Sequence, residues 1–321
     1  EQPITANAEP TARSMRTVAM TALGGTSIEW YDFFIYGTAA ALVFPTLFFA
    51  EDMPRYVSLI ASFSTFAVGF LARPVGGVVF GHFGDRVGRK AALVTALMMM
   101  GVATTLIGLL PGYADIGPLA PLLLIFLRFV QGLAVGGQWG GAMLLVTENA
   151  PSNQRGFYGA FAQVGAPAGL VLANLAFLAV SGSLSDEAFM DWGWRVPFIS
   201  SVLLIGLSLY VQLKLEDTEA FKELAKASEP AAAKPRSPVV QALKTYPREI
   251  GLAAGSFLGV QVTFYICVAW IISYGNDPEG LNMARSDMLT AVLISTMFAI
   301  PANFIFGAWS DRHGRQGIYK L

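Results

Sequence analysis

The 321-residue sequence has little charge: 13% of its residues are charged, whereas 54% are hydrophobic. A soluble domain carries roughly 25% charged residues, because it needs them to cover its surface. The mean hydropathy of +0.54 agrees with this shortage. A soluble globular fold is therefore excluded for most of the chain, and the composition indicates lipid as its main solvent. The net charge of −1 neither favours nor excludes nucleic acid as a partner.

The sequence is also poor in residues that bind metals or act as nucleophiles. It has one cysteine, Cys267, and two histidines, His82 and His313. A single cysteine excludes an intramolecular disulfide framework and a thiolate metal site. Neither histidine has a second ligand type nearby, and we interpret both as solvated loop-end residues. An enzyme would need a nucleophile–base pair or a metal cluster. We therefore expect no enzyme activity, no metal and no cofactor.

Long apolar runs are plentiful. A helix needs about 20 apolar residues to cross a bilayer. Only helices or closed barrels satisfy the backbone in lipid, and continuous runs of this length indicate helices. The sequence thus predicts an all-α membrane protein. Eight runs meet the criterion, near 17–49, 56–80, 91–111, 118–146, 156–181, 194–214, 250–274 and 286–309.

The distribution of lysine and arginine predicts the orientation. Most of them fall in alternate loops, together with the N-terminus, whereas the opposite loops are acidic. Because basic loops stay on the cytoplasmic side, we expect the N-terminus inside. The membrane that we expect the chain to cross is the bacterial inner (plasma) membrane. A polar, proline-rich stretch follows the sixth run. The predicted division is a disordered tail (1–14), a six-helix bundle (15–214), a cytoplasmic linker (215–248) and a partial second bundle (249–321).

A repeated motif supports two related bundles. Gly81-His82-Phe83-Gly84-Asp85-Arg86-Val87-Gly88-Arg89 matches Gly307-Ala308-Trp309-Ser310-Asp311-Arg312-His313-Gly314-Arg315 at Gly, Asp, Arg, Gly and Arg. Each copy follows the second apolar run of its bundle, as in transporters built from parallel repeats. We predict a cytoplasmic gate in which the first glycine allows close helix approach and the aspartate faces a helix N-terminus. The alternative is a basic turn that only enforces topology. The predicted gate residues are Gly81, Asp85, Arg86, Gly88, Arg89, Glu148, Arg155, Asp311, Arg312 and Arg315.

The motif at 81–90 resembles the loop between helices 2 and 3 of the major facilitator superfamily. Further segments resemble its metabolite:proton symporter branch, which carries citrate, 2-oxoglutarate, shikimate, proline or betaine: Ile28–Gly37, Gly69–Gly77, Gly136–Ala142 and Gly193–Phe198. The resemblance implies twelve helices, whereas eight runs are present, so we expect four helices to be missing from the C-terminal side. It also implies that the partner of Asp85, the N-terminus of helix 11, is missing. Relatives often have Glu at the position of Gln138.

Charged residues inside apolar runs are candidates for function, because charge at depth is costly. Glu29, Asp32 and Arg128 fall at similar depth, about 15–22 Å along their helices at 1.5 Å per residue. We predict that Arg128 pairs with Glu29 or Asp32. A carboxylate in such surroundings can load and release a proton. Arg128 can clamp a substrate carboxylate. A static ion pair that fixes helix packing is the alternative.

Other polar residues are weaker candidates. Arg73 and Gln138 are placed near the cytoplasmic helix ends, where Arg73 can simply snorkel. Gln131, Gln163, Gln261 and Tyr265 are explained equally well as hydrogen bonds between helices. The full predicted substrate and proton site is Glu29, Asp32, Tyr36, Arg128, Gln138, Gln163, Gln261 and Tyr265.

The resemblance and these charges predict a proton-driven symporter of a small polar metabolite, a carboxylate or zwitterion, working by alternating access. Its partners would be this substrate, protons and the lipid bilayer, with no nucleic acid, and the protein would be a monomer. The proton gradient replaces any cofactor as the energy source. A drug or metabolite:proton antiporter of the same superfamily is the alternative, although Gly165-Ala166-Pro167-Ala168-Gly169 departs from the antiporter pattern.

Overall fold

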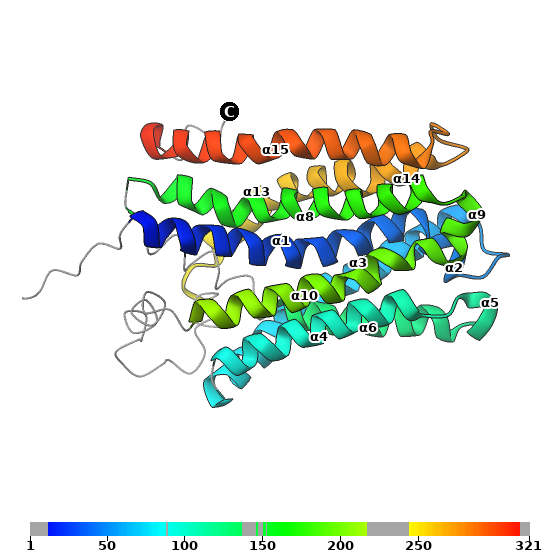
Figure 1. Cartoon of the computed structure of the whole chain (residues 1–321), viewed down its shortest axis with the longest axis horizontal. Coiled ribbons are helices and arrows are strands. Elements are labelled where there is room, and N and C mark those ends of the chain that lie inside the picture. The colour runs from blue at the N-terminus through cyan, green and yellow to red at the C-terminus, as the bar shows by residue number, and fades with distance from the viewer. Residues whose placement is uncertain are drawn as a thin grey trace, which may run out of the picture.

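The computed structural model describes residues 12–87, 89–136, 146, 150–151, 153–216 and 244–314. Within these residues the chain is helical and no strand occurs. Long helices run side by side along the longest axis of the molecule, and short ones cap one end (Figure 1). The all-α fold predicted from the apolar runs is confirmed.

The long helices follow the apolar runs in order. They are α1 (Ala12–Leu42), α3 (Arg55–Val87), α4 (Arg89–Leu109), α6 (Leu119–Gly136), α8 (Arg155–Ser183), α10 (Arg195–Glu216), α13 (Pro247–Tyr265) and α15 (Arg285–His313). Short elements connect them: α2 (Phe44–Leu47), α5 (Tyr113–Ile116), α9 (Asp186–Ala188), η1 (Phe189–Gly193), η2 (Ile266–Trp270) and α14 (Ile271–Asn276).

Length and composition single out five of the described helical stretches as candidates to cross a membrane. They are Arg55–Phe83, Leu119–Gly136, Arg155–Ser183, Pro247–Asn276 and Arg285–His313. The fourth stretch joins α13, η2 and α14 into one apolar run that contains a π-helical segment. The predicted domain boundaries stay a prediction, because residues 1–11 and 217–243 lie outside the described part of the chain.

Among the first six long helices, α1 contacts α3, α8 and α10, while α6 contacts both α3 and α4. Helices α3 and α6 approach so closely that glycine is needed at their crossing. An added methyl group at Gly132 would overlap the Gly69 carbonyl oxygen, and one at Gly76 would overlap the Leu133 carbonyl oxygen. Small residues allow this approach in membrane helices. The close crossing brings the side chains of both helices toward α1.

The helices that follow residue 243 attach to the first six in different ways. Helix α15 packs along α8, whereas α14 and η2 contact α1. In Figure 1 the C-terminal end of α15 lies at the same end of the molecule as the N-terminal ends of α1 and α8, and α2, α5 and α9 lie at the opposite end. The second copy of the repeated motif therefore sits at the end where α8 begins.

Candidate functional site

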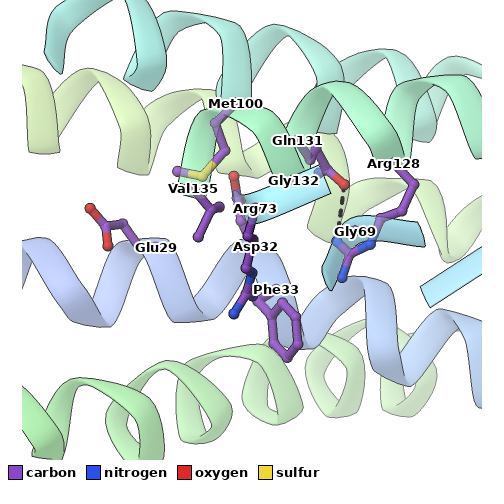
Figure 2. A pocket seen from close by; sticks show the side chains of 10 residues that line it. All are labelled: Glu29, Asp32, Phe33, Gly69, Arg73, Met100, Arg128, Gln131, Gly132 and Val135. Carbon is purple, nitrogen blue, oxygen red and sulfur yellow. Dashed lines mark hydrogen bonds between the residues drawn. The ribbon is translucent and has the colours of Figure 1, made fainter. Parts of the chain in front are cut away.

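Charged side chains from three helices line one cavity inside the first six helices. Glu29 and Asp32 come from α1, Arg73 from α3 and Arg128 from α6. The other lining residues are Phe33, Gly69, Met100, Gln131, Gly132 and Val135. Figure 2 shows Glu29 and Arg128 on opposite sides of this cavity, with Asp32 and Arg73 between them. Glu29, Asp32 and Arg128, for which the sequence predicts similar depth, thus line one cavity.

The predicted direct pair between Arg128 and a carboxylate is wrong. In the described part of the chain no ion pair joins Arg128 to Glu29 or Asp32. Instead, Arg128 Nη1 donates a hydrogen bond to Gln131 Oε1 at 3.1 Å (Figure 2). Gln131 Nε2 donates to Thr104 Oγ1 at 2.6 Å, and Thr104 Oγ1 donates to Asp32 Oδ2 at 2.9 Å. Two neutral side chains therefore lie between the cation and the carboxylate.

Aromatic rings hold the Arg128 guanidinium in place. Its Cζ lies 4.1 Å from the ring centroid of Tyr36, 4.7 Å from that of Phe66 and 5.1 Å from that of Phe33. A guanidinium is attracted to the face of an aromatic ring, more strongly away from water. The Tyr36 hydroxyl is in turn 2.6 Å from Thr65 Oγ1, which fixes its ring. The charge of Arg128 is thus compensated by rings as well as by hydrogen bonds.

The glycine at position 69 makes room for this guanidinium. A methyl group there would lie 2.7 Å from Arg128 Nε and 3.1 Å from Cζ. Arg128 Nε has no hydrogen-bond partner among the described residues, although it is buried. The Nε–H group of Arg128 can therefore donate a hydrogen bond to a ligand in the cavity.

The second arginine of the cavity does not extend toward solvent as snorkelling would require. Arg73 Cζ lies 4.6 Å from the ring centroid of Phe70 and 5.0 Å from that of Phe33. Arg73 and Glu29 line the same cavity, which thus holds opposite charges. Arg73 consequently belongs to the site, which its predicted position near a helix end did not suggest.

Tyr265 is the contribution of the second bundle. Its ring contacts those of Phe33, Phe66 and Phe70 at centroid distances of 6.1, 6.0 and 5.6 Å. Its hydroxyl is buried and has no hydrogen-bond partner among the described residues. Tyr265 is the last residue of α13 and comes directly before the π-helical segment η2. Tyr265 therefore packs on the aromatic rings next to the cavity, although it does not line the cavity itself.

Other predicted site residues have different outcomes. Gln163 is not in the central cavity: it lines a separate hollow between α8 and α15, together with Arg155, Asn303 and Ser310. Gln261 is half-buried on α13, one turn before Tyr265. Gln138 lies outside the described residues. Gln131, Thr104 and the three phenylalanines were missed or ranked low, since single neutral residues in an apolar run carry little signal.

The second copy of the repeated motif joins α15 to α8. Asp311 accepts hydrogen bonds from the backbone N–H groups of Gly156 at 2.7 Å and Phe157 at 2.9 Å, in the first turn of α8. A carboxylate at a helix N-terminus satisfies free N–H groups and complements the helix dipole. Gly307 packs against Gly156, where a methyl group on Gly307 would lie 2.7 Å from the Gly156 carbonyl oxygen. Asp311 and Gly307 thus behave as the motif predicts.

The first copy shows less. A methyl group on Gly81 would meet no atom within 4 Å among the described residues, so the close helix approach predicted at Gly81 is not seen there. Arg155 and Arg312 are exposed. The predicted roles of Asp85, Arg86 and Arg89 concern side chains that the structure does not describe, and Gly88, Glu148 and Arg315 also fall outside the described residues.

Ion pairs link the two bundles at the opposite end. Arg285 Nη1, at the start of α15, lies 2.9 Å from Asp186 Oδ1, and its Cζ lies 4.1 Å from the Phe189 ring centroid. Arg55 Nε, at the start of α3, lies 3.2 Å from Asp277 Oδ2. With Asp311 at the other end, the bundles are therefore held together on both sides of the central cavity.

Comparison with known proteins identifies the family. Residues 17–246 match the family described as sugar (and other) transporter. An inner membrane metabolite transport protein of Escherichia coli is 45% identical over 94% of this chain and 68% of its own length. The shikimate transporter of Escherichia coli is 41% identical over 95% and 68%. A proline/betaine transporter of Salmonella typhimurium is 33% identical over 94% and 61%. The chain thus spans about two thirds of the length of these relatives.

Solved structures show the same fold. The proton:xylose symporter bound to 6-bromo-6-deoxy-D-glucose, a member of the major facilitator superfamily, aligns with a TM-score of 0.63 at 14% identity. The alignment covers 95% of this chain and 71% of that one. A partially occluded, inward-open xylose transporter from E. coli aligns with a TM-score of 0.65 at 16% identity, over 95% and 73%. At such low identity the likeness concerns the fold alone.

Proposed function

Because the chain belongs to the sugar (and other) transporter family of the major facilitator superfamily, we propose that it is a proton-coupled symporter of a small carboxylate or zwitterion. Members of this family are transporters and not enzymes. The observation that carries the proposal is a buried carboxylate, Asp32, connected to a buried arginine, Arg128, at a cavity that α1, α3, α4 and α6 line. Asp32 takes up the proton, and Arg128 binds the substrate carboxylate.

The chemistry of the cavity supports an anionic or zwitterionic substrate. A neutral sugar does not require two arginines, Arg73 and Arg128, at its binding site, whereas a carboxylate is bound well by a guanidinium fork. The rings around the cavity can also face a quaternary ammonium group by cation–π attraction. The names of two relatives, a shikimate transporter and a proline/betaine transporter, agree with this substrate class.

The contacts at both ends support alternating access. Opening toward one side must separate α15 from the start of α8, where Asp311 binds. Opening toward the other side must break Arg55–Asp277 and Arg285–Asp186. We propose that the end with Asp311 is cytoplasmic, because the basic motif copies lie there and basic loops stay inside.

The test uses the full-length protein in proteoliposomes with an imposed pH gradient. Shikimate, proline and glycine betaine are the probes, and xylose is the neutral comparison. We expect the gradient to accelerate uptake of at least one of the three probes. Asp32→Asn should reduce this acceleration about tenfold or more, because the amide takes up no proton. The variant should still exchange labelled for unlabelled substrate, because the amide oxygen still accepts a hydrogen bond.

Arg128→Gln should weaken both uptake and exchange. The control for Asp32→Asn is Asp52→Asn, which makes the same chemical change at an exposed carboxylate near the end of the molecule. Acceleration by the opposite gradient would indicate an antiporter instead. Full gradient-driven uptake in Asp32→Asn and Arg128→Gln would reject this site.

A further inference from the structure

The hydrogen bonds between Arg128 and Asp32 have a direction that the chemistry of the groups imposes. A guanidinium has only donors, so Gln131 must present its carbonyl oxygen to Arg128. The amide nitrogen of Gln131 then faces Thr104 and donates to its oxygen. The hydroxyl of Thr104 has a single hydrogen, which is left for an acceptor on its other side. All four side chains are buried, so water does not compete for these positions.

Two acceptors compete for that hydrogen. Thr104 Oγ1 lies 2.9 Å from Asp32 Oδ2 and 2.9 Å from the backbone carbonyl oxygen of Met100. A charged carboxylate accepts a hydrogen bond roughly twice as strong as a neutral group does. While Asp32 is ionised, the hydrogen therefore points to Asp32. A neutral Asp32 has no such advantage over Met100.

The proton has a free atom to bind. Asp32 Oδ1 is buried and accepts no hydrogen bond from the described residues, so a proton can add there while Oδ2 keeps its place beside Thr104. Ser201 lies near this carboxylate, and its hydroxyl donates a hydrogen bond to the Phe198 carbonyl oxygen. No other covalent bond changes.

Protonation of Asp32 weakens the hydrogen bond of Arg128 through this series of hydrogen bonds. Hydrogen bonds in a row polarise and strengthen one another in a low-dielectric interior. An ionised Asp32 polarises the Thr104 hydroxyl, which then accepts more strongly from Gln131, and Gln131 in turn accepts more strongly from Arg128. When Asp32 becomes neutral, the chain weakens and Arg128 is released toward the cavity.

We propose that Thr104 and Gln131 are positioning residues that couple protonation of Asp32 to the freedom of Arg128 to bind substrate. This role rests on the proposed function, in which Asp32 takes up the proton and Arg128 binds the substrate. It makes the order of events explicit: the proton binds first, and the affinity for the anionic substrate then rises.

The other charged and titratable groups around Asp32 are few in the described part of the chain. Glu29, Tyr31 and Tyr36 share its helix, Arg73 faces it from α3, Arg128 from α6, and Tyr265 of α13 packs against the ring of Phe33, the next residue after Asp32. Helices α4 and α10 present the hydroxyls of Thr104 and Ser201. Among the groups described, only Thr104 and Gln131 form a continuous hydrogen-bonded path between Asp32 and Arg128.

The test compares two neighbouring threonines on α4. Thr104→Val removes the hydroxyl of the path but keeps its shape, and Thr104→Ser restores the hydroxyl. The matched control is Thr105→Val, because the one hydrogen bond of Thr105 Oγ1 among the described residues goes to the Gly101 carbonyl oxygen of its own helix. The measurement is the KM and the maximal rate of uptake at acidic and alkaline outside pH, with whichever of shikimate, proline and glycine betaine the wild-type protein accumulates.

In the wild-type protein KM should be lower at acidic pH. In Thr104→Val we expect KM at alkaline pH to fall to the acidic value, by about three- to tenfold, the factor that one hydrogen bond corresponds to. Gradient acceleration should be lost as well. A general packing defect would raise KM or lower the rate at every pH. Thr104→Ser and Thr105→Val should keep the wild-type pH dependence.

A Thr104→Val protein with the wild-type pH dependence of KM would overturn the role of the path while leaving the proposed function intact. A wild-type protein without gradient acceleration would instead reject the proposed function itself. If Thr104→Val does not reach the membrane, Gln131→Met interrupts the same path at its other link and is judged by the same criterion. Failure of both variants to fold would show that the path serves packing, and would overturn the proposal.

Discussion

Two aspartates hold the molecule together in different ways. Asp32 lies deep inside, and its hydrogen bond comes from a side-chain hydroxyl that has a second acceptor within reach. Asp311 lies at the end of α15 and accepts hydrogen bonds from two backbone N–H groups of α8. Backbone N–H groups in the first turn of a helix have no partner within the helix. The bond of Asp32 is thus easily rearranged by a proton, whereas that of Asp311 changes only when whole helices separate.

This difference separates two tasks of a transporter. The central cavity can respond to protons and substrate without movement of the backbone, because its contacts are side chains of α1, α4 and α6. The end contacts respond to the relative position of the bundles, because they join α15 to α8 and α9, and the end of α14 to α3. Variants in the cavity should therefore alter coupling, and variants at the ends should alter only the balance between open states.

The largest effect is expected from crowding the cavity. In Gly69→Ala the new methyl group would lie 2.7 Å from Arg128 Nε, so the guanidinium must leave its place among the rings. Overpacking costs about 1–3 kcal/mol, which corresponds to about a 5- to 160-fold loss of uptake. Uptake and exchange in proteoliposomes measure it.

Gly206→Ala on α10 is the control for this substitution, because an added methyl group there meets no atom within 4 Å among the described residues. The alanine should be tolerated, since alanine favours helix more than glycine does. Equal losses in Gly69→Ala and Gly206→Ala would show that the close fit around Arg128 is unimportant.

A smaller effect is expected at the other aspartate. Asp311→Ala removes the acceptor for the first turn of α8, and loss of such a cap costs about 1 kcal/mol, or about fivefold in an equilibrium. We expect α8 and α15 to separate more often. Alkylation of Ala160→Cys, a buried position that faces Gly307, measures this in a Cys267→Ser background.

The comparison predicts that Asp311→Ala keeps the wild-type pH dependence of KM. Asp311→Asn should have a weaker effect than Asp311→Ala, since one oxygen remains, and Glu279→Ala in the exposed loop should have none. A changed pH dependence in Asp311→Ala would mean that the two regions are not separate.

The sequence predicts the helices well because each spanning helix needs a long apolar run. A polar group in such a run stands out, and for this reason the sequence also predicts the site residues Asp32, Tyr36, Arg128 and Tyr265. Depth along a helix follows from residue number, but direction around the axis does not. For this reason the direct pairing of Arg128 was wrong, and Gln163 was assigned to the wrong cavity.

Neutral partners were harder to find. Thr104 and Thr105 are adjacent in one apolar run, and nothing in the sequence says which of them faces α1. Phe33, Phe66 and Phe70 are ordinary residues of a membrane helix until Arg73 and Arg128 are seen against their rings. Such roles arise from the crossing of helices, which the pattern of a single chain does not specify.

The smallest effect is expected from the ion pair Arg55–Asp277 at the end opposite Asp311. The side chain of Arg55 is 60% exposed. Exposed ion pairs contribute about 0–1 kcal/mol to stability. Arg55→Asp should therefore shift the balance toward opening at this end by about fivefold or less, and Asp277→Arg in the same chain should reverse the shift. Alkylation of Ser273→Cys, a buried position beside the pair, reports the opening in the Cys267→Ser background.

Because salt screens exposed charges, the difference between wild type and Arg55→Asp should shrink in concentrated salt. A shift that is large and insensitive to salt would show that this pair locks the protein as firmly as Asp311 does, and would remove the ranking of the end contacts.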